Sequence, residues 1–590
     1  MFKLLFKNMK AKHWVAVVFI FLLTLAEVYF MMTIVAYIGS LTAAVGNVQN
    51  DGTTAVWLNG LGMIVCAVAM VVVDIIIKFI ASATASGTVT FLRQKLYERV
   101  NEFAIADFAS FSTESLITRT TNDMQNVHLA WLTFLKTAFV APVTMVWSII
   151  LLATQANGKL TIVTAIWVFL LVGAVAVLLL MVTPKFRIVQ KLTDALNVSS
   201  RENLTGVRVV RAFNAETYQE GKFENVNAPY TKVQIFVGRV LAFFTPFVMM
   251  VMMGLSLSIL WVSAYIINGL SLEQATLSFT STNSFVMLAS QIVMSFILVI
   301  TLIVIWPRAS VSAKRIYEVI THSVSVLDTD HPVDFKEKGT IEFKNVGFAY
   351  PGSDKEAVSN ISFKVKKGET IAFIGATGSG KTTIINLIPR MADCTSGEVL
   401  VDGVNVKDYT QESLHNLLGY IPQKAVMFDG SVSSNVSYGY NGKAKASKSQ
   451  IKKAIEVAQA TDFVEKMDKK YESHIARGGT NVSGGQKQRL AIARAIARNP
   501  EIYIFDDSFS ALDYKTDYIL RKELKEYTKD ATTLIVAQRI GTILQADKII
   551  VLDEGKCVGI GTHKELLKTC DVYKQIALSQ LSKEELEHAW

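Results

Sequence analysis

Long apolar runs separated by polar connections mark the first half of the chain. Six runs are long enough to cross a bilayer, which takes roughly 20 residues. They cover residues 14–38, 55–81, 138–154, 160–182, 236–267 and 275–306. Several lysines precede the first run, as in a secretory signal, but the apolar core of a signal is only about 7–15 residues long. The pattern predicts a membrane domain over residues 1–320, with six helices and an uncleaved first span.

Basic residues are divided unevenly among the connections. Residues 39–54 and 268–273 contain no Lys or Arg, and residues 155–159 contain one. The connections 93–136 and 185–239 are rich in both. Positive charge accumulates in cytoplasmic loops of membrane proteins, so we expect both termini in the cytoplasm.

The two basic connections are too long to be loops. They contain many helix formers and few Pro or Gly clusters, so we expect helical extensions of the spans into the cytoplasm. Each extension is expected to turn at a short helix, near residues 111–116 and 212–218, which would offer a contact surface to a soluble domain. Two unrelated amphipathic hairpins are the alternative.

Composition supports a membrane part joined to a soluble part. A hydrophobic fraction of 51% and a mean hydropathy of +0.34 are too high for an ordinary soluble protein. The net charge of +9 does not indicate a nucleic-acid partner, because the basic residues lie between apolar segments and not in one patch. Four cysteines without paired spacing are interpreted as reduced thiols. They are Cys66, Cys394, Cys557 and Cys570.

Three charged residues fall inside predicted spans, at a cost of about 2.5–3.5 kcal/mol each on insertion scales. Asp74 and Lys78 are four apart on one helix face and either pair structurally or face a cavity. Glu27 has no such neighbour, and either meets a cationic substrate or makes an interhelical hydrogen bond. Met249 and Met253 either line an adaptable substrate pocket or face lipid and neighbouring helices.

After residue 320 the apolar runs end. Residues 321–340 are polar, contain Pro332 and Gly339, and predict a linker, and the chain then turns strand-like at Ile341. Further on, the apolar run 371–374 leads into a glycine-rich loop at 375–382, followed by helix formers. Such glycines let backbone N–H groups point at phosphates, while Lys381 and Thr382 supply a cation and a hydroxyl for Mg²⁺. An ordinary glycine turn is the alternative.

Two further stretches belong with this loop. The apolar run 502–505 ends in Asp506, which places a carboxylate at the end of a buried strand as a partner for Mg²⁺. The stretch 483–486 reads Ser-Gly-Gly-Gln and opens a helix that runs to Arg498, giving a second anion-binding helix N-terminus. Two phosphate-binding features in a domain with one nucleotide site indicate that the second completes the site of a partner.

At these residues the chain resembles the ATP-binding cassette exporters, in the half-transporter form with one membrane domain and one nucleotide-binding domain. Residues 375–382 resemble the Walker A motif, Gln423 the Q-loop, 483–486 the signature motif, 502–506 Walker B, 510–513 the D-loop, and 116–123 the segment after the first coupling helix. The resemblance implies an all-α six-helix transmembrane domain with long cytoplasmic helical extensions, followed by an α/β P-loop nucleotide-binding domain over residues 341–590.

The resemblance also implies ATP and Mg²⁺ as cofactors. The implied ATP-binding residues are Tyr350, Gly375, Thr377, Gly378, Ser379, Gly380, Lys381, Thr382 and Thr383. The implied Mg²⁺ partners are Thr382, Gln423 and Asp506, and the implied signature and D-loop residues are Ser483, Gly484, Gly485, Gln486 and Asp513. Two halves would pair head to tail around ATP, with binding opening the cavity outward and hydrolysis resetting it.

Three departures from the family pattern stand out. Asp507 replaces the glutamate that usually polarises the attacking water, and a displacement on the order of 1 Å can cost about a hundredfold in rate. Gln538 replaces the usual switch-loop histidine and cannot carry the proton or charge of an imidazole. Arg477 lies where a glutamate usually precedes the signature. We therefore assign Asp507, Gln538 and Gln423 as candidate catalytic residues of a degenerate site.

These observations predict one subunit of a heterodimeric exporter in a bacterial-type plasma membrane, moving hydrophobic or amphipathic compounds by multidrug-type efflux. This chain would bind ATP, hydrolyse it slowly, and offer its signature to a partner that carries the usual Glu and His. A homodimeric lipid or peptide exporter is the nearest alternative, although we expect no amino-terminal peptidase domain. An ATP-gated regulatory or channel-like protein is a further alternative, distinguished by conductance without substrate-stimulated turnover.

Overall fold

The computed structural model describes residues 5–6, 8–46, 53–155, 158–268, 270–329, 333, 338–442 and 444–581. The chain divides into two compact units. The helical unit comprises Met1–Arg99 and Leu116–Thr321, and the sheet unit comprises Val100–Ser115 and His322–Trp590. Part of the predicted linker 321–340, including Pro332, lies outside the described residues.

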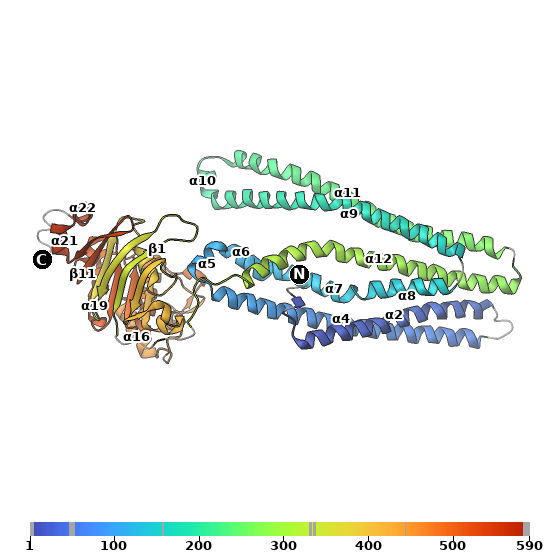
Figure 1. Cartoon of the computed structure of the whole chain (residues 1–590), viewed down its shortest axis with the longest axis horizontal. Helices are drawn as coiled ribbons and strands as arrows, with labels where there is room; N and C mark the ends of the chain where they lie inside the picture. The colour runs from blue at the N-terminus through green and yellow to red at the C-terminus, as the bar shows by residue number, and fades with distance from the viewer. Residues whose placement is uncertain are drawn as a thin grey trace. The chain divides into compact units, whose positions relative to one another are not determined.

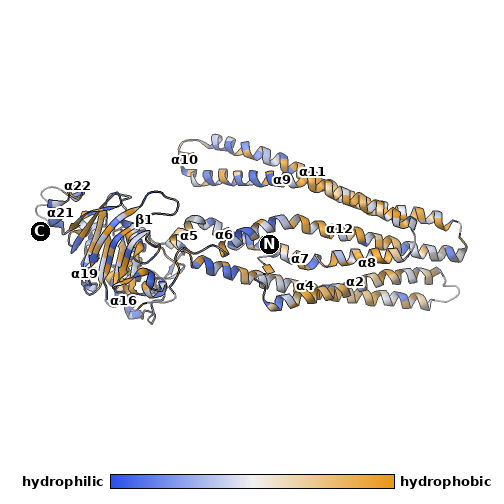
Figure 2. Cartoon of the chain, in the orientation of Figure 1, coloured by the Kyte–Doolittle hydropathy of each residue, from blue (hydrophilic) through white to orange (hydrophobic). Residues whose placement is uncertain are grey.

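Long helices make up the helical unit. Its elements are α2 (Ala11–Gly46), α4 (Thr54–Asn101), α6 (Thr113–Thr118), the π-helical turn η1 (Arg119–Asp123), α7 (Met124–Thr137), α8 (Val140–Thr154), α9 (Gly158–Thr205), α10 (Val207–Ala212), α11 (Glu216–Ile267) and α12 (Leu272–Ile320). Six helical stretches of the described chain are long and apolar enough to cross a membrane, as predicted. Helices α2, α4, α9, α11 and α12 extend beyond their predicted apolar runs, whereas α8 stays within the run 138–154. Figure 2 shows the ends of α9 and α11 next to α10 as mostly hydrophilic.

The helices of this unit pack along their lengths. Helix α9 runs beside α11, and α12 packs against α2, α7, α8 and α11 (Figure 1). Small residues permit close approach where membrane helices meet. A Cβ at Gly254 would lie 2.4 Å from the Trp167 ring, and the Trp167 indole N–H donates to Ser258 Oγ at 3.1 Å. This contact fixes the register of α9 on α11.

Short helices lie at both predicted turns. Near the predicted position 111–116 the structure has α6, preceded by a further short helix, α5 (Ile105–Ser110). Ser112 Oγ accepts the Ser115 N–H at 3.2 Å and so starts α6. Helix α10 ends at Ala212, where the second predicted helix, 212–218, was to begin, so that position was wrong. Asn214 accounts for the difference, because its positive φ of 50° makes the turn into α11.

Two main sheets organise the sheet unit. The six-stranded sheet has the order β12-β11-β3-β10-β9-β6, and the four-stranded sheet has the order β2-β1-β4-β5. Strands β6, β9, β10, β3 and β11 are parallel, and β12 is antiparallel to β11. The strands are β1 (Ile341–Phe348), β2 (Val358–Val365), β3 (Thr370–Gly375), β4 (Ser396–Val401), β5 (Val404–Asn405), β6 (Leu418–Ile421), β7 (Gly430–Ser431), β8 (His474–Ile475), β9 (Ile502–Asp506), β10 (Thr532–Val536), β11 (Lys548–Asp553) and β12 (Lys556–Gly561).

Helices cover the six-stranded sheet and connect its strands. They are α13 (Lys381–Leu387), α14 (Gln411–Leu417), α15 (Val432–Val436), α16 (Lys448–Val457), α17 (Thr461–Val464), α18 (Gly484–Arg498), α19 (Tyr514–Tyr527), α20 (Ile540–Ile543), α21 (His563–Thr569) and α22 (Asp571–Gln580), with 3₁₀ turns η2 (Val406–Asp408), η3 (Lys470–Glu472) and η4 (Arg477–Gly479). The predicted α/β class is therefore confirmed.

Strand β3 is buried on both faces, as expected for a central parallel strand. Ile371 and Phe373 pack in the core shared with the four-stranded sheet. Ala372 and Ile374 pack in the core that includes α18 and α22. This double anchoring fixes the carboxyl end of β3, where the glycine-rich loop begins.

Candidate nucleotide-binding site

The glycine-rich loop joins the end of β3 to the start of α13, in the order that the sequence predicts. A Cβ at Gly375 would lie 2.1 Å from the Leu552 carbonyl oxygen. Gly380 has φ of 95°, and a Cβ there would lie 2.5 Å from Val358. Side chains are excluded at these two positions, so the backbone can approach a phosphate closely there and offer its N–H groups.

Lys381 is buried under this loop. Its Nζ donates to the carbonyl oxygens of Gly375 at 2.8 Å and Ala376 at 2.7 Å, with Ser379 Oγ at 3.4 Å. Burial lowers the pKa of the Lys381 ammonium, and the nearby Asp506 and Asp507 charges partly offset that effect. The loop carbonyls thus hold the Lys381 ammonium group in place. The phosphate oxygens of a nucleotide can replace these carbonyls as its hydrogen-bond acceptors.

Thr382 and Asp506 meet across the loop, as the predicted Mg²⁺ site requires. Thr382 Oγ1 donates to Asp506 Oδ1 at 3.1 Å, and burial raises the pKa of Asp506. Hydroxyl, carboxylate and amide oxygens are the hard ligands that Mg²⁺ takes, usually together with substrate phosphates and water. Thr382, Asp506 and Gln423 therefore fit the ion, which would supply charge neutralisation at the phosphates.

Asp507 is hydrogen-bonded to the two other predicted catalytic residues. Its Oδ2 accepts hydrogen bonds from Gln538 Nε2 at 2.7 Å and Gln423 Nε2 at 3.2 Å. The residue is 8% exposed and has a positive φ of 45°, a conformation that is uncommon outside glycine. Burial raises the pKa of its carboxyl group. The structure thus brings all three candidates together at the end of β9.

Tyr350 lies at the edge of the phosphate loop. Its hydroxyl is 3.1 Å from Thr383 Oγ1 on α13, and its ring packs edge-on against Phe348 at 4.9 Å. The residue is 45% exposed. A half-exposed ring held beside α13 leaves a face on which a base can stack.

The signature residues form the amino-terminal end of α18. Ser483 and Gln486 make a reciprocal capping box, with Ser483 N–H donating to Gln486 Oε1 at 2.9 Å and Gln486 N–H donating to Ser483 Oγ at 3.3 Å. Ser483 and Gly484 are exposed, and a Cβ at Gly484 would meet nothing within 4 Å. A Cβ at Gly485 would lie 3.2 Å from the Ala511 carbonyl oxygen. The helix end is therefore preformed and open.

Asp513 starts the helix that follows Walker B. Its Oδ2 accepts the Thr516 N–H at 3.0 Å and so caps α19. That backbone hydrogen bond lowers the pKa of Asp513.

Gln488, on α18, donates to the Pro422 carbonyl oxygen at 3.2 Å and links the signature helix to Gln423.

Comparisons with known proteins agree with this geometry. The family described as ABC transporter matches residues 358–510, and the family described as ABC transporter transmembrane region matches residues 15–296. The chain is 31% identical over 536 residues to the ATP-dependent lipid A-core flippase of Haemophilus influenzae, covering 87% of each. The chain belongs to the ABC transporter family.

Two further comparisons agree with this family membership. It is 31% identical over 486 residues to a probable multidrug resistance ABC transporter ATP-binding/permease protein of Bacillus subtilis, covering 82% of this chain and 81% of that one. A solved structure of a bacterial Atm1-family ABC exporter with ATP bound aligns with a TM-score of 0.79 at 21% identity, over 97% of this chain and 98% of that one. The chain is an ABC exporter half-transporter and a multi-pass membrane protein, and its family couples ATP hydrolysis to transport.

The membrane part of the transporter carries the candidate substrate residues on two different helices. Glu27 is on α2, whereas Met249 and Met253 are on α11 and are exposed, and α12 packs against both helices. Among the described residues Glu27 Oε2 is buried without a hydrogen-bond partner. The predicted pairing of Asp74 with Lys78 is confirmed, with a 2.6 Å contact.

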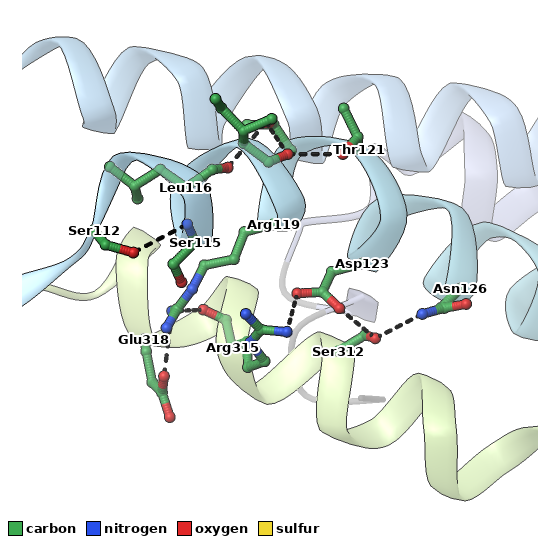
Figure 3. Close-up of polar contacts among 12 residues, drawn as sticks. Ser112, Ser115, Leu116, Arg119, Thr121, Asp123, Asn126, Ser312, Arg315 and Glu318 are labelled. Atoms are coloured by element: carbon green, nitrogen blue, oxygen red, sulfur yellow. Dashed lines mark hydrogen bonds and ion pairs between the residues drawn. The ribbon is translucent and has the colours of Figure 1, made fainter. Parts of the chain in front are cut away.

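The segment after α5 grips α12 through a polar cluster in the helical unit (Figure 3). Within the π-helical turn η1, Arg119 donates to the Arg315 carbonyl oxygen and to Glu318 at 3.2 Å. Asp123 accepts from Ser312 Oγ at 2.7 Å and pairs with Arg315 at 3.2 Å. Both Arg119 and Asp123 are buried. A π-turn often marks a functional position, and here it points two side chains at one helix.

Asp107 plays a similar part in the sheet unit, and sequence reasoning missed it. Its carboxylate accepts from Ala104 N–H at 2.9 Å, Ser325 N–H at 3.2 Å and His322 Nε2 at 3.2 Å. Burial by itself would raise the pKa of Asp107, but these hydrogen bonds outweigh it and lower the pKa. The short helix α5 is thereby tied to the chain that follows α12. An isolated aspartate in a polar stretch gives no sequence signal for this role.

Proposed function

We propose that this ABC transporter is one subunit of a heterodimeric exporter, with both termini in the cytoplasm, that moves hydrophobic or amphipathic compounds. Its own Walker site would hold ATP and hydrolyse it slowly, while its signature would complete the competent site of the partner. The arrangement of Gln538 and Gln423 on Asp507 carries the proposal.

A general base must keep an acceptor free for the proton that it removes. In this chain one carboxylate oxygen of Asp507 already accepts two side-chain amides. The side chain is also one methylene shorter than the glutamate expected from the resemblance, which places its oxygens farther from an attacking water. Gln538 can donate to phosphate but cannot take up a proton. These features support slow hydrolysis at this site.

Exposed surfaces support assembly with a second subunit. Ser483 and Gly484 lie open at the start of α18, and α10 and the turn after it expose Val209 by 61% and Phe213 by 78%. Contiguous apolar groups at a helix turn mark an interaction surface. The relative that is named a multidrug resistance transporter supports an apolar small-molecule substrate.

The test measures ATP binding and turnover by the purified full-length chain, with its oligomeric state determined by mass. We expect tight Mg-ATP binding and slow turnover without a partner that carries Glu and His at positions matching Asp507 and Gln538. Brisk hydrolysis by a verified homodimer would contradict the heterodimer.

A homodimeric lipid exporter is the second candidate, favoured by the relative named a lipid A-core flippase. Reconstitution separates the two: the homodimer would flip labelled lipid across vesicles without another subunit. Under the heterodimer proposal, the chain alone leaves both labelled lipid and cationic dyes in place.

A further inference from the structure

The side-chain amide of Gln580 bridges the two ends of residues 538–540, called here the switch segment. Its Nε2 donates to the Gln538 carbonyl oxygen at 2.8 Å, and its Oε1 accepts the Ile540 N–H at 2.8 Å. Strand β10 ends at Val536, and Ala537 N–H still donates to the Phe373 carbonyl oxygen at 3.1 Å. Gln580 thus takes up backbone groups just beyond the point where the β3–β10 pairing ends.

Gln580 is carried by a firmly anchored helix. In α22, Tyr573 and Ala577 are fully buried, and Tyr573 Oη is 2.6 Å from His563 Nδ1 on α21. Helix α22 also packs against α20, β3 and β11. Strand β3 leads into the phosphate loop. The helix that carries Gln580 is therefore anchored on the same sheet that positions the nucleotide.

A long exposed side chain loses rotamer entropy when it is fixed in one geometry. The two backbone hydrogen bonds offset that loss only if both form. We propose that Gln580 is a positioning residue, which fixes residues 538–540 so that the Gln538 side chain meets Asp507 and the nucleotide phosphates. This inference rests on the proposed role of Gln538 in the ATP site.

The bridge requires both a donor and an acceptor, and substitutions separate the two. Gln580→Ala removes both. Gln580→Glu has the same shape, but when ionised it presents only acceptors and repels the Gln538 carbonyl oxygen. When protonated, its O–H can donate again. Ser579→Ala is the matched control, because the Ser579 hydroxyl donates to the Ile576 carbonyl oxygen within its own helix.

The experiment uses the full chain in lipid nanodiscs and measures single-turnover ATP hydrolysis over a range of ATP concentrations. We expect Gln580→Ala to lower the maximal rate about 3- to 10-fold, the effect of one or two net hydrogen bonds on a barrier. The half-saturating ATP concentration should stay unchanged, and hydrogen exchange should speed up over residues 538–543. Gln580→Glu should match Ala at pH 8 and recover in part relative to wild type near pH 4.3, where about half of glutamate side chains at their ordinary pKa are protonated.

Gln580→Ala and Ser579→Ala with equal rates and equal exchange would overturn the inference. So would a loss confined to ATP affinity, or a Gln580→Glu variant whose rate relative to wild type does not change with pH. Gln538→Ala is measured in parallel. If it leaves the rate unchanged, the proposed role of Gln538 fails and the inference falls with it. If it lowers the rate while Gln580→Ala does not, only the inference fails.

Discussion

The amide of Gln538 donates to Oδ2 of Asp507 at 2.7 Å, which joins the switch segment to the residue that follows Walker B. This bond gives a buried carboxylate a neutral donor. It leaves the other carboxylate oxygen, Oδ1, to act as the acceptor for a proton. The two departures from the family pattern are therefore one structural feature, and they should be tested together.

Restoring the family residues should raise hydrolysis. Asp507→Glu combined with Gln538→His lengthens the carboxylate by one methylene and supplies an imidazole that can carry charge. We expect the turnover of the chain to rise about 10- to 100-fold, the range expected for correct placement of a general base. Steady-state ATPase assays on the nanodisc-embedded chain check this, with Asp507→Asn as the inactive control. An unchanged rate in the double variant would show that this site is not limited by these two residues.

Neutralising Asp507 should stabilise the chain in the absence of nucleotide. Burial raises the folded-state pKa of Asp507 above its unfolded value, so the charged form disfavours folding. The stability associated with the protonated form is full below the unfolded pKa and is lost as pH rises through the folded pKa. Asp507→Asn should therefore raise the melting temperature of the sheet unit more at pH 8 than at pH 4. Thermal unfolding of wild type and variant at both pH values decides it, and a larger gain at pH 4 would contradict the sign.

The signature can be altered without disturbing the fold of this chain. A Cβ at Gly484 meets nothing within 4 Å, so Gly484→Ala should leave the melting temperature within about 1 °C. It should still abolish hydrolysis at a partner's competent site, because a side chain there would keep phosphate from the start of α18. Trapping labelled nucleotide in each site of the assembled pair measures this. If the pair that contains Gly484→Ala hydrolyses ATP at the wild-type rate, this chain's signature takes no part in the reaction.

Ser483→Ala tests the same surface with a different cost. Loss of the helix cap destabilises by about 1 kcal/mol, so a reduced melting temperature is expected along with lost partner turnover. Nucleotide bound at this chain's own Walker loop should be unaffected in either variant.

The cluster in Figure 3 should matter more than an exposed ion pair of similar length. Asp123→Ala leaves Arg315 and Ser312 without the buried acceptor that they share. We expect a loss of about 1–3 kcal/mol in stability, together with ATP turnover that no longer responds to transported compound. Glu202→Ala is the control, because its 2.7 Å pair with Lys222 is exposed and water screens its contribution to stability. Equal effects of the two substitutions would show that the cluster has no special role.

The sequence predicted the elements that local chemistry dictates. The glycine-rich loop between β3 and α13 could be predicted because few other structures need these residues in this order. The six spans could be predicted because the thickness of a bilayer sets the length of an apolar run that crosses it. The sequence did not predict features that depend on contacts between segments far apart along the chain. Gln580 is an ordinary polar residue at a helix end until the sheet places it beside Gln538, and the extent of α10 depends on where Asn214 turns the chain. Both depend on tertiary packing, which hydrophobic periodicity does not encode.

Glu27 offers a test of the substrate class. Its buried oxygen has no hydrogen-bond partner among the described residues. If Glu27 binds cationic compounds, Glu27→Gln should raise the half-saturating concentration of a cationic dye about 10-fold, one lost charge interaction, and leave a neutral analogue of the same size unchanged. The double substitution Asp74→Asn with Lys78→Met removes a neutral pair and should affect both compounds equally. If Glu27→Gln lowers transport of both compounds alike, the residue acts as an interhelical hydrogen-bonding group and not as a binding site for charge.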